Sequence, residues 1–375
     1  MDPMSFTSSP ASDGKLQKVY LDQTHLGRHV TGIERIAIEL FEKQAFAGTV
    51  LVPVRSSGVL SMIIKQQIWL PLLALMNPSA KFVFPGFPPS PLFVFARNRA
   101  YHYVHDLFLV TRRQDLNNKA RLYMAWPFRI AVTKLRHFLV NSEKTRSELV
   151  PFIKPDASIV LYRPSVRNVF ELSQQDRAER GDDLQRIRVV SVGTVEPRKN
   201  YIAAADIVAR LNVLHPGGAE LHIVGRAGWG PDADHLKEFP NVTVHGFLPA
   251  ADARRVIEDA DVYLCTSHDE GLGLPLLEVQ YAGLPVVAPG QAVFREVLGS
   301  AATFIEPRNP DECAARILTL LLQNGWRARS LGEALANVTR WNGLAAEDFE
   351  RARQLFAAAS AAPHSDAAAN PALRS

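Results

Sequence analysis

The chain has 375 residues, of which 47% are hydrophobic and 21% charged, and its formal net charge is +4. This composition excludes wholesale disorder, and the length exceeds what one hydrophobic core usually serves, so we expect two domains. Cys265 and Cys313 are the only two cysteines and lie in no metal-binding or redox motif, which excludes a disulfide framework and predicts two reduced core residues.

The two ends of the chain differ in composition from the rest. Residues 1–14 and residues 361–375 are rich in Ser, Ala and Pro, and we expect both to be disordered. The start lacks a signal-peptide pattern, and we find no stretch with the roughly 18 apolar residues that span a bilayer. These features predict a cytoplasmic protein.

Residues 15–172 are predicted to form an N-terminal Rossmann-like domain. A strand at 18–22, a helix at about 32–47 and a strand at 49–54 form a βαβ unit, because the apolar residues have the period of each element in turn. Further strands at 81–84, 102–104 and 137–140 would complete a parallel sheet.

The segment 59–76 within this domain is apolar apart from Lys65, Gln66 and Gln67. It has two interpretations, a core helix of the domain, which we favour, or a helix that lies in a membrane interface. Vesicle co-sedimentation that is unchanged by Trp69→Ala with Leu72→Ala would argue against the second interpretation.

Residues 173–185 are polar without an apolar period and are predicted to be the linker. After it, strands at 187–193, 220–224, 242–245, 262–265, 285–288 and 302–305 alternate with helices at about 200–214, 250–260, 273–283, 292–298 and 310–323. Residues 186–340 therefore form a second Rossmann-like domain. A helical pattern continues beyond about 324 to about 359, and we expect 341–360 to cross back to the first domain.

A basic motif follows the first strand of the second domain. Gly193-Thr194-Val195-Glu196-Pro197-Arg198-Lys199-Asn200 lies between that strand and a helix, so Arg198 and Lys199 project at the carboxyl edge of the sheet. Ligands of open α/β sheets bind at this edge, and adjacent Arg and Lys side chains can neutralise a diphosphate. An exposed basic turn is the alternative for this motif taken alone.

A glycine-containing motif follows the strand at 262–265. It runs from Glu270 to Glu278 and opens a helix, so the backbone amides of Gly271, Leu272, Gly273 and Leu274 could hold an anion at the helix start. Both glutamates could touch one ligand that lies along this helix start. The alternative is an acid near a helix N-terminus together with an unrelated surface glutamate.

A metal site is not expected, although His25 and His29 are four residues apart and His102, His105 and Asp106 form a cluster. No His-Glu-x-x-His motif is present, and the region of His25 runs into a glycine turn. The sequence also lacks the glycine-rich signatures of P-loop and dinucleotide-binding proteins. We therefore expect no cofactor.

Taken in order, these motifs resemble the retaining GT-B glycosyltransferases of family 4. The likeness is strongest over about 187–323, through the two motifs above, Leu221 to Gly230, His245 to Pro249 and Ala282 to Val287, and looser in the first half, through 21–26, 31–35, 105–107 and 140–143. Within the family, the segments Thr31 to Arg35 and Val224 to Trp229 are similar to those of bacterial mannosyltransferases of O-antigen and exopolysaccharide assembly.

The resemblance implies a role for each matching residue. Arg198 and Lys199 would hold the donor diphosphate, Glu270 would orient hydroxyls of the transferred hexose, and Glu278 would bind the ribose. His105 would lie across the cleft near the sugar, and with Glu270, Arg198 and Lys199 it completes the expected catalytic set. The loop at Gly32 would contact phosphate or acceptor, and the turn at Gly246 and Phe247 would lie near the base.

The implied enzyme is a retaining hexosyltransferase with two Rossmann-like domains facing a cleft. It would move mannose from GDP-mannose to a polysaccharide or polyprenyl-linked acceptor, without a metal. The basic first half, in which residues 1–180 hold 24 Lys and Arg against 14 Asp and Glu, suits such an acceptor or an anionic membrane surface, and no nucleic-acid-binding motif accompanies it. A surface that is merely basic and soluble is the alternative for that charge.

Two other functions fit the same architecture. One is a sugar-nucleotide 2-epimerase, which would turn over the donor without an acceptor. The other is a non-catalytic protein that binds nucleotide sugars and would tolerate loss of the diphosphate-binding side chains.

Overall fold

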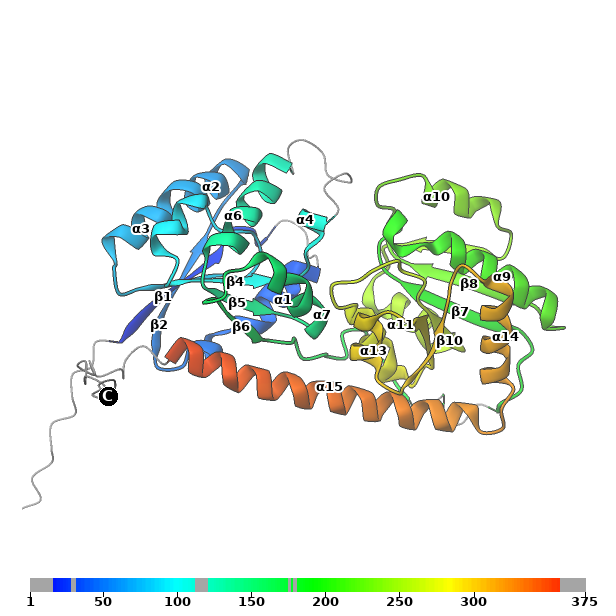
Figure 1. The fold of residues 1–375 in the computed structure, drawn as a ribbon. Helices are drawn as coiled ribbons and strands as arrows, with labels where there is room; N and C mark the ends of the chain where they lie inside the picture. The colour runs from blue at the N-terminus through cyan, green and yellow to red at the C-terminus, as the bar shows by residue number, and fades with distance from the viewer. Residues whose placement is uncertain (1–15, 28–31, 112–120, 175–176, 178–180, 358–375) are drawn as a thin grey trace, which may run out of the picture.

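The computed structural model describes residues 16–27, 32–111, 121–174, 177 and 181–357. Over these ranges the chain forms two α/β domains that lie side by side (Figure 1). Each domain is built on a parallel six-stranded sheet. The expected fold class, two doubly wound Rossmann-like domains, is confirmed.

The sheet of the first domain, called the N-domain below, has the order β2-β1-β3-β4-β5-β6. Its strands are β1 (Gln17–Gln23), β2 (Thr49–Arg55), β3 (Lys81–Phe84), β4 (Ala100–Val104), β5 (His137–Val140) and β6 (Ser158–Leu161). Five of them were predicted. The strand β6 was missed, because it is a four-residue edge strand that only its pairing with β5 makes recognisable.

The helices of the N-domain are α1 (Gly32–Leu40), α2 (Val59–Ile64), α3 (Leu70–Met76), α4 (Phe108–Thr111), α6 (Trp126–Lys134) and α7 (Glu143–Leu149), with short helical turns η1 (Lys43–Phe46), η2 (Lys65–Trp69), η3 (Pro91–Ala96), η5 (Arg121–Ala125) and η6 (Val150–Phe152). The predicted helix at 32–47 is wrong in its second part. The helix ends at Leu40, and η1 follows as a separate turn whose Phe46 ring packs 4.8 Å from Phe356 near the chain's end.

The segments α2, η2 and α3 form one continuous helical stretch, Val59–Met76. Its mean hydropathy is 1.6, and by length and composition alone it could cross a membrane, so the expectation that no such stretch exists is wrong. One side of it, with Met62, Leu70 and Ala74, is nevertheless buried in the domain.

The second domain, called the C-domain below, has the sheet order β12-β11-β10-β7-β8-β9. Its strands are β7 (Ile187–Val192), β8 (Ala219–Val224), β9 (Val242–Gly246), β10 (Val262–Leu264), β11 (Val286–Pro289) and β12 (Ala302–Ile305), close to the predicted positions. The chain starts at β7, adds β8 and β9 on one side, and then returns to add β10 on the other side. The carboxyl ends of β7 and β10 therefore form the topological switch point, where ligands of such sheets bind.

The helices of the C-domain are α9 (Tyr201–Leu214), α10 (Asp232–His235), α11 (Ala250–Asp259), α12 (Leu274–Glu278), α13 (Ala292–Leu298) and α14 (Pro310–Leu321), with turns η7 (Pro197–Lys199), η8 (Leu236–Glu238) and η9 (Val279–Ala282). The predicted helix at 273–283 is thus α12 followed by the tighter turn η9. Cys265 and Cys313 are free and buried, as predicted.

The last helix, α15 (Trp326–Ala357), runs along both domains (Figure 1). It begins with Trp326 in the C-domain core and ends against the N-domain, where the Lys81 ammonium donates to the carbonyls of Leu355 and Phe356 at 2.9 and 3.0 Å. The helix is uninterrupted at residue 340, where we expected a separate crossing segment to begin.

The segment 173–185, predicted to be the linker, is described only in part. Its Arg177 is buried against the C-domain and donates to the carbonyls of Ala260 and Asp261, at 2.8 Å each. The Arg177 guanidinium also stacks over the Trp326 ring. This part of the segment is therefore held against the C-domain and the start of α15.

Candidate active site

The two motifs of the C-domain meet at the switch point. β7 and β10 pair in parallel register, Val189 opposite Val262 and Val190 opposite Tyr263, so the loops that follow them leave the sheet side by side. The first loop turns through η7, and Asn200 in the left-handed region starts α9. The second loop reaches α12. The topology thus places Arg198 and Lys199 beside Glu270.

Glu270 forms an ion pair with both cations of the first motif. Arg198 Nη1 lies 2.6 Å from Glu270 Oε2, and Lys199 Nζ lies 2.5 Å from Glu270 Oε1. Ser267 Oγ also donates to Glu270 Oε1 at 2.8 Å. Both carboxylate oxygens therefore accept hydrogen bonds from neighbouring side chains.

The charge of Glu270 is stabilised by these partners. Burial raises the pKa of the carboxyl group, but Lys199 and Arg198 outweigh burial and lower it to about 2. Arg198 is itself held by Glu196, whose Oε1 lies 2.7 Å from Arg198 Nη2, and by the carbonyl of Asp269 at 2.9 Å. The result is a fixed, fully ionised cluster at the sheet edge.

The glycine-containing loop approaches this cluster through its backbone. The side chains of Leu272 and Leu274 are 4% and 8% exposed and belong to the hydrophobic core, so only their main-chain groups could contact a ligand. Gly273 has φ +81°, a conformation that favours glycine, and directly precedes α12. This conformation allows the sharp entry into the helix.

The backbone of Gly271 approaches the N-domain closely. A Cβ atom at this position would lie 2.8 Å from the carbonyl oxygen of His105, the residue that follows β4 of the N-domain. The same carbonyl accepts from Asn141 Nδ2 at 2.8 Å, while Ser142 Oγ donates to the Gly271 carbonyl at 3.3 Å. Any side chain at Gly271 would push the domains apart.

His105, predicted to lie across the cleft, is placed there by β4. Its Nε2 lies 2.7 Å from the Pro85 carbonyl, which can only accept, so Nε2 carries the proton and Nδ1 is the free acceptor. Burial lowers the pKa of His105 to about 4, against a smaller opposite effect of this hydrogen bond. The ring is therefore neutral near pH 7.

Lys144 and Asp269 of this site were not singled out from the sequence, and Asp106 was named only in a possible metal cluster. Lys144, at the start of α7, lies 2.7 Å from Asp269 Oδ1 and donates to the Glu270 carbonyl at 3.2 Å. Asp106 lies near Arg198, Lys144 and Asp269, and burial raises its pKa. Asp106 lies two residues and Lys144 four residues after the end of a strand, and the rule that ligand-binding residues lie near the carboxyl ends of strands is the signal that could have found both.

Glu278, predicted to bind ribose, is buried at the end of α12 and forms an ion pair with Arg35 of α1. Arg35 Nε also lies 3.0 Å from Glu39 Oε1 on the same helix. Burial raises the pKa of Glu278 in spite of the favourable charge of Arg35. Arg35 lies in the Thr31 to Arg35 segment, but its pairing with Glu278 could not be read from the sequence.

The remaining predicted residues, Gly32, Gly246 and Phe247, lie apart from these contacts. Gly32 is the first residue of α1, and residues 28–31 of its loop lie outside the described ranges. Gly246 ends β9 with φ +73°, and Phe247 after it is 85% exposed. Within the described part of the chain, no hydrogen bond or ion pair joins Gly246 or Phe247 to Arg198, Lys199 or Glu270.

The site is nearly filled in this conformation. The hollow between Lys199, Ser267, Glu270 and Gly273 has a volume of only about 10 Å³, the space of one water molecule. The domains also touch at α7 and α13, where the Glu143 amide donates to Glu296 Oε1 and Oε2 at 2.9 Å each.

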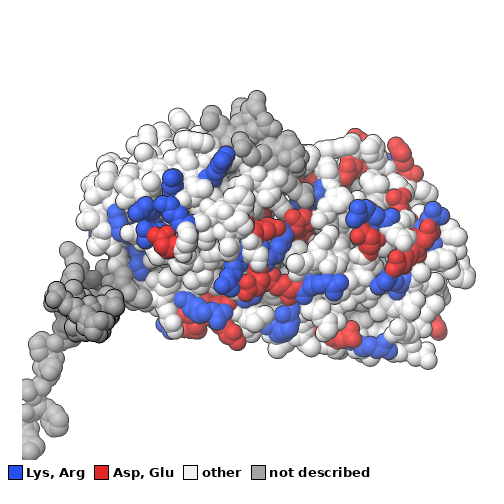
Figure 2. Space-filling model, in the orientation of Figure 1, with Lys and Arg blue, Asp and Glu red and all other residues white. Residues whose placement is uncertain are grey.

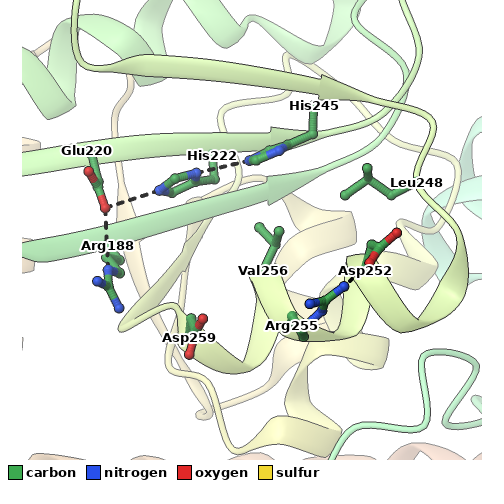
Figure 3. A pocket seen from close by; sticks show the side chains of 9 residues that line it. All are labelled: Arg188, Glu220, His222, His245, Leu248, Asp252, Arg255, Val256 and Asp259. Atoms are coloured by element: carbon green, nitrogen blue, oxygen red, sulfur yellow. Dashed lines mark hydrogen bonds and ion pairs between the residues drawn. The ribbon is translucent and has the colours of Figure 1, made fainter.

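A larger hollow of about 480 Å³ lies elsewhere on the C-domain (Figure 3). It lies between one face of β7 to β9 and α11, where His222 Nδ1 and His245 Nε2 are 3.0 Å apart and Glu220 lies 3.2 Å from His222. None of the predicted catalytic residues lines it, although Leu248 is two residues after Gly246. We therefore keep the candidate site at the switch point.

No group of three or more His, Cys, Asp or Glu side chains arranged to hold a metal occurs within the ranges that the structure describes. Burial lowers the pKa of His102 to about 3, and its Nδ1 lies 3.4 Å from the Phe84 carbonyl inside the N-domain. The site thus offers cations and backbone amides as its anion-binding groups.

Comparison with known proteins identifies the architecture. The family model described as "Glycosyl transferases group 1" matches residues 186–323. The chain is 25% identical over 256 residues to O-antigen chain mannosyltransferase B of Escherichia coli, covering 65% of this chain and 67% of that protein. It is 29% identical over 213 residues to D-inositol 3-phosphate glycosyltransferase of Segniliparus rotundus, of whose length it covers less than half, 45%.

The crystal structure of WaaG, a glycosyltransferase involved in lipopolysaccharide biosynthesis, superimposes with a TM-score of 0.61 at 17% identity. The superposition covers 90% of this chain and 99% of that one, so the two share the arrangement of both domains. The chain therefore has the two-domain GT-B fold, and its C-domain matches the glycosyl transferases group 1 family over residues 186–323.

Proposed function

We propose that the chain transfers a hexose, with retention of configuration, from a nucleotide diphosphate-sugar bound between the loops that follow β7 and β10. The observation that carries the proposal is the convergence of Arg198 and Lys199 on Glu270, at 2.6 and 2.5 Å, at the switch point of the C-domain sheet. Two cations beside the starts of two helices suit a diphosphate.

The cluster would exchange partners when the donor binds. The diphosphate would take over Arg198 and Lys199, and hexose hydroxyls would donate to the Glu270 carboxylate that these cations now neutralise. As the glycosidic C–O bond lengthens, negative charge grows on the departing diphosphate. Fixed cations stabilise that charge without reorganising, which is the main way such sites lower a barrier.

The proposed stereochemical course follows from the same arrangement. The acceptor hydroxyl would enter on the face from which the diphosphate leaves, and the leaving phosphate would help to take its proton. Glu270 and Glu278 contact different partners, the C-domain cations and Arg35 respectively, so they are not the paired acid and nucleophile of a retaining glycosidase, which flank one bond. The anomeric configuration of the product, read by NMR, tests retention directly.

The similarity to mannosyltransferases supports a proposal for the donor and the acceptor. We infer mannose from GDP-mannose, because the O-antigen relative is a mannosyltransferase, and a polysaccharide or polyprenyl-linked saccharide as acceptor. A role in lipopolysaccharide or exopolysaccharide assembly at the cytoplasmic face of the membrane would follow. We further infer that no metal is needed, so excess EDTA should leave the transfer rate unchanged.

A thermal-shift panel of nucleotide sugars tests donor choice, because a ligand that binds the folded state raises the melting temperature. GDP-mannose should give the largest shift, and Arg198→Ala with Lys199→Ala should abolish it, whereas the exposed control Lys237→Ala should not. A larger shift with a UDP-sugar would refute the donor. Turnover of donor without any acceptor would favour the epimerase alternative.

A further inference from the structure

The outer face of the helical stretch Val59–Met76 is apolar and exposed. Leu60, Ile64, Ile68, Leu72 and Leu75 recur at helical spacing and are between 41% and 71% exposed. The opposite face, with Met62, Leu70 and Ala74, is buried in the core beneath the sheet strands. A helix at a protein surface normally presents polar side chains to water, and this one does not.

The neighbouring elements extend the same surface. The turn η3 contacts both α3 and α6, and it exposes Leu92, Val94 and Phe95, while α6 exposes Trp126. We define the apolar face of the N-domain by these exposed side chains: Val59, Leu60, Ile64, Ile68, Trp69, Leu72, Leu75, Met76, Leu92, Val94, Phe95 and Trp126. An apolar surface contributed by three adjacent elements is larger than the scattered apolar residues of ordinary surfaces and indicates a binding face.

The charges around this face have one sign. From Lys43 to His105 the sequence holds six Lys and Arg and no Asp or Glu. Arg55, Lys65 and Arg97 in this stretch, and Arg129 and Lys134 on α6, form no ion pair within the described ranges. In Figure 2 the visible N-domain surface is mostly white with blue side chains and little red, whereas red and blue mix over the C-domain.

We infer that the apolar face docks in the plane of a bilayer that contains anionic phospholipids. Apolar side chains would enter the acyl boundary, and the unpaired cations would meet the headgroup phosphates. The helical stretch would lie on the bilayer and not cross it, because its inner face belongs to the N-domain core. A second copy of the chain is a poorer occupant, because pairing two such faces would bring their unpaired cations together.

This inference goes beyond the proposed transfer reaction and does not depend on it. The apolar face contains none of the candidate catalytic residues. A variant of this face can therefore lose its binding to membranes and still transfer hexose to a soluble acceptor. Failure of the membrane test and failure of the proposed reaction are therefore distinguishable.

The experiment is co-sedimentation of the full chain with vesicles of phosphatidylcholine alone and of phosphatidylcholine with about 30% phosphatidylglycerol. We expect binding to the anionic vesicles, and a loss of at least about tenfold in Ile68→Ser with Leu72→Ser and Leu75→Ser. The matched control replaces exposed apolar residues of the C-domain, Val213→Ser with Leu322→Ser, and should bind like the unchanged chain. Circular dichroism checks that each variant is folded.

A second pair of variants tests the charges. Arg97→Glu with Arg129→Glu should reduce binding to the anionic vesicles and leave the apolar face intact, whereas Lys237→Glu on the C-domain should have no effect. The inference is overturned if the unchanged chain does not sediment with anionic vesicles, or if it binds both vesicle types equally. A second result would also overturn it. In that case the unchanged chain would not bind vesicles, and sedimentation velocity would show a dimer that is absent in the triple serine variant.

Discussion

Arg35 of α1 and Glu278 of α12 form an ion pair that joins the two domains across 243 positions of sequence. Glu278 is the residue that we expect to bind the ribose of the donor. Its carboxylate is therefore engaged by the N-domain, as that of Glu270 is engaged by Arg198 and Lys199. Donor binding would release both carboxylates from arginine or lysine partners.

Replacing Glu278 by Gln should weaken donor binding and leave the chemical step largely intact. We expect the KM for the donor to rise about tenfold with little change in kcat, since one charge-assisted hydrogen bond to the ribose is lost. Steady-state kinetics measure the split. The matched control is Glu39→Gln, which also removes a carboxylate from Arg35, and an equal effect of the two variants would assign the loss to Arg35 instead.

Replacing Glu270 by Ala should separate binding from turnover. The rate of transfer should fall about a hundredfold or more, because the group that orients the hexose is lost. Affinity for the free nucleoside diphosphate should stay the same or rise, since Glu270 no longer competes for Arg198 and Lys199. Calorimetry with GDP measures the affinity, and a transfer assay measures the rate. Near-normal turnover would show that Glu270 is not a catalytic residue.

Lys199→Ala should lower both the affinity for GDP and the rate of transfer, in contrast to Glu270→Ala. The lost ammonium neutralises the diphosphate in the ground state and in the transition state, so we expect weaker GDP binding together with a roughly hundredfold slower transfer. The exposed Lys237→Ala is the control. A Lys199→Ala enzyme that binds GDP as tightly as the unchanged chain would contradict the placement of the diphosphate.

The pH dependence of activity should show no step from His105 between pH 5 and 8. Its pKa is lowered to about 4 by burial, so the ring stays neutral over that range and Nδ1 remains an acceptor. His105→Gln should reduce kcat and leave the shape of the profile unchanged. A step near pH 6.5 that disappears in this variant would show that His105 titrates in the working enzyme.

Asp348 of α15 should matter more for stability than its neighbour Glu347. Asp348 is fully buried and lies 2.8 Å from Arg163 Nη1, which ties the helix to the N-domain. Asp348→Ala leaves that buried guanidinium without this partner and should cost about 3 kcal/mol in the free energy of unfolding. Glu347→Ala, on the exposed side of the same turn, should cost less than about 0.5 kcal/mol in urea denaturation.

Local patterns predicted much of this protein. Strong apolar runs bounded by glycine and proline located eleven of the twelve strands, and the same alternation indicated two parallel sheets. The basic motif at Arg198 and the glycine motif at Glu270 were recognisable because each directly follows a strand. In a parallel sheet such positions share one edge, so the sequence alone also indicated that they converge.

Contacts between distant segments decided the rest. The weak edge strand β6 is defined by its pairing with β5, and α1 ends early because the Phe46 turn packs against the end of α15. The pairing of Glu278 with Arg35 and the approach of Gly271 to the His105 carbonyl depend on how the two domains meet. The periodicity of apolar residues cannot predict the interface between the domains, because that interface arises from side-chain packing and charge between segments more than a hundred residues apart.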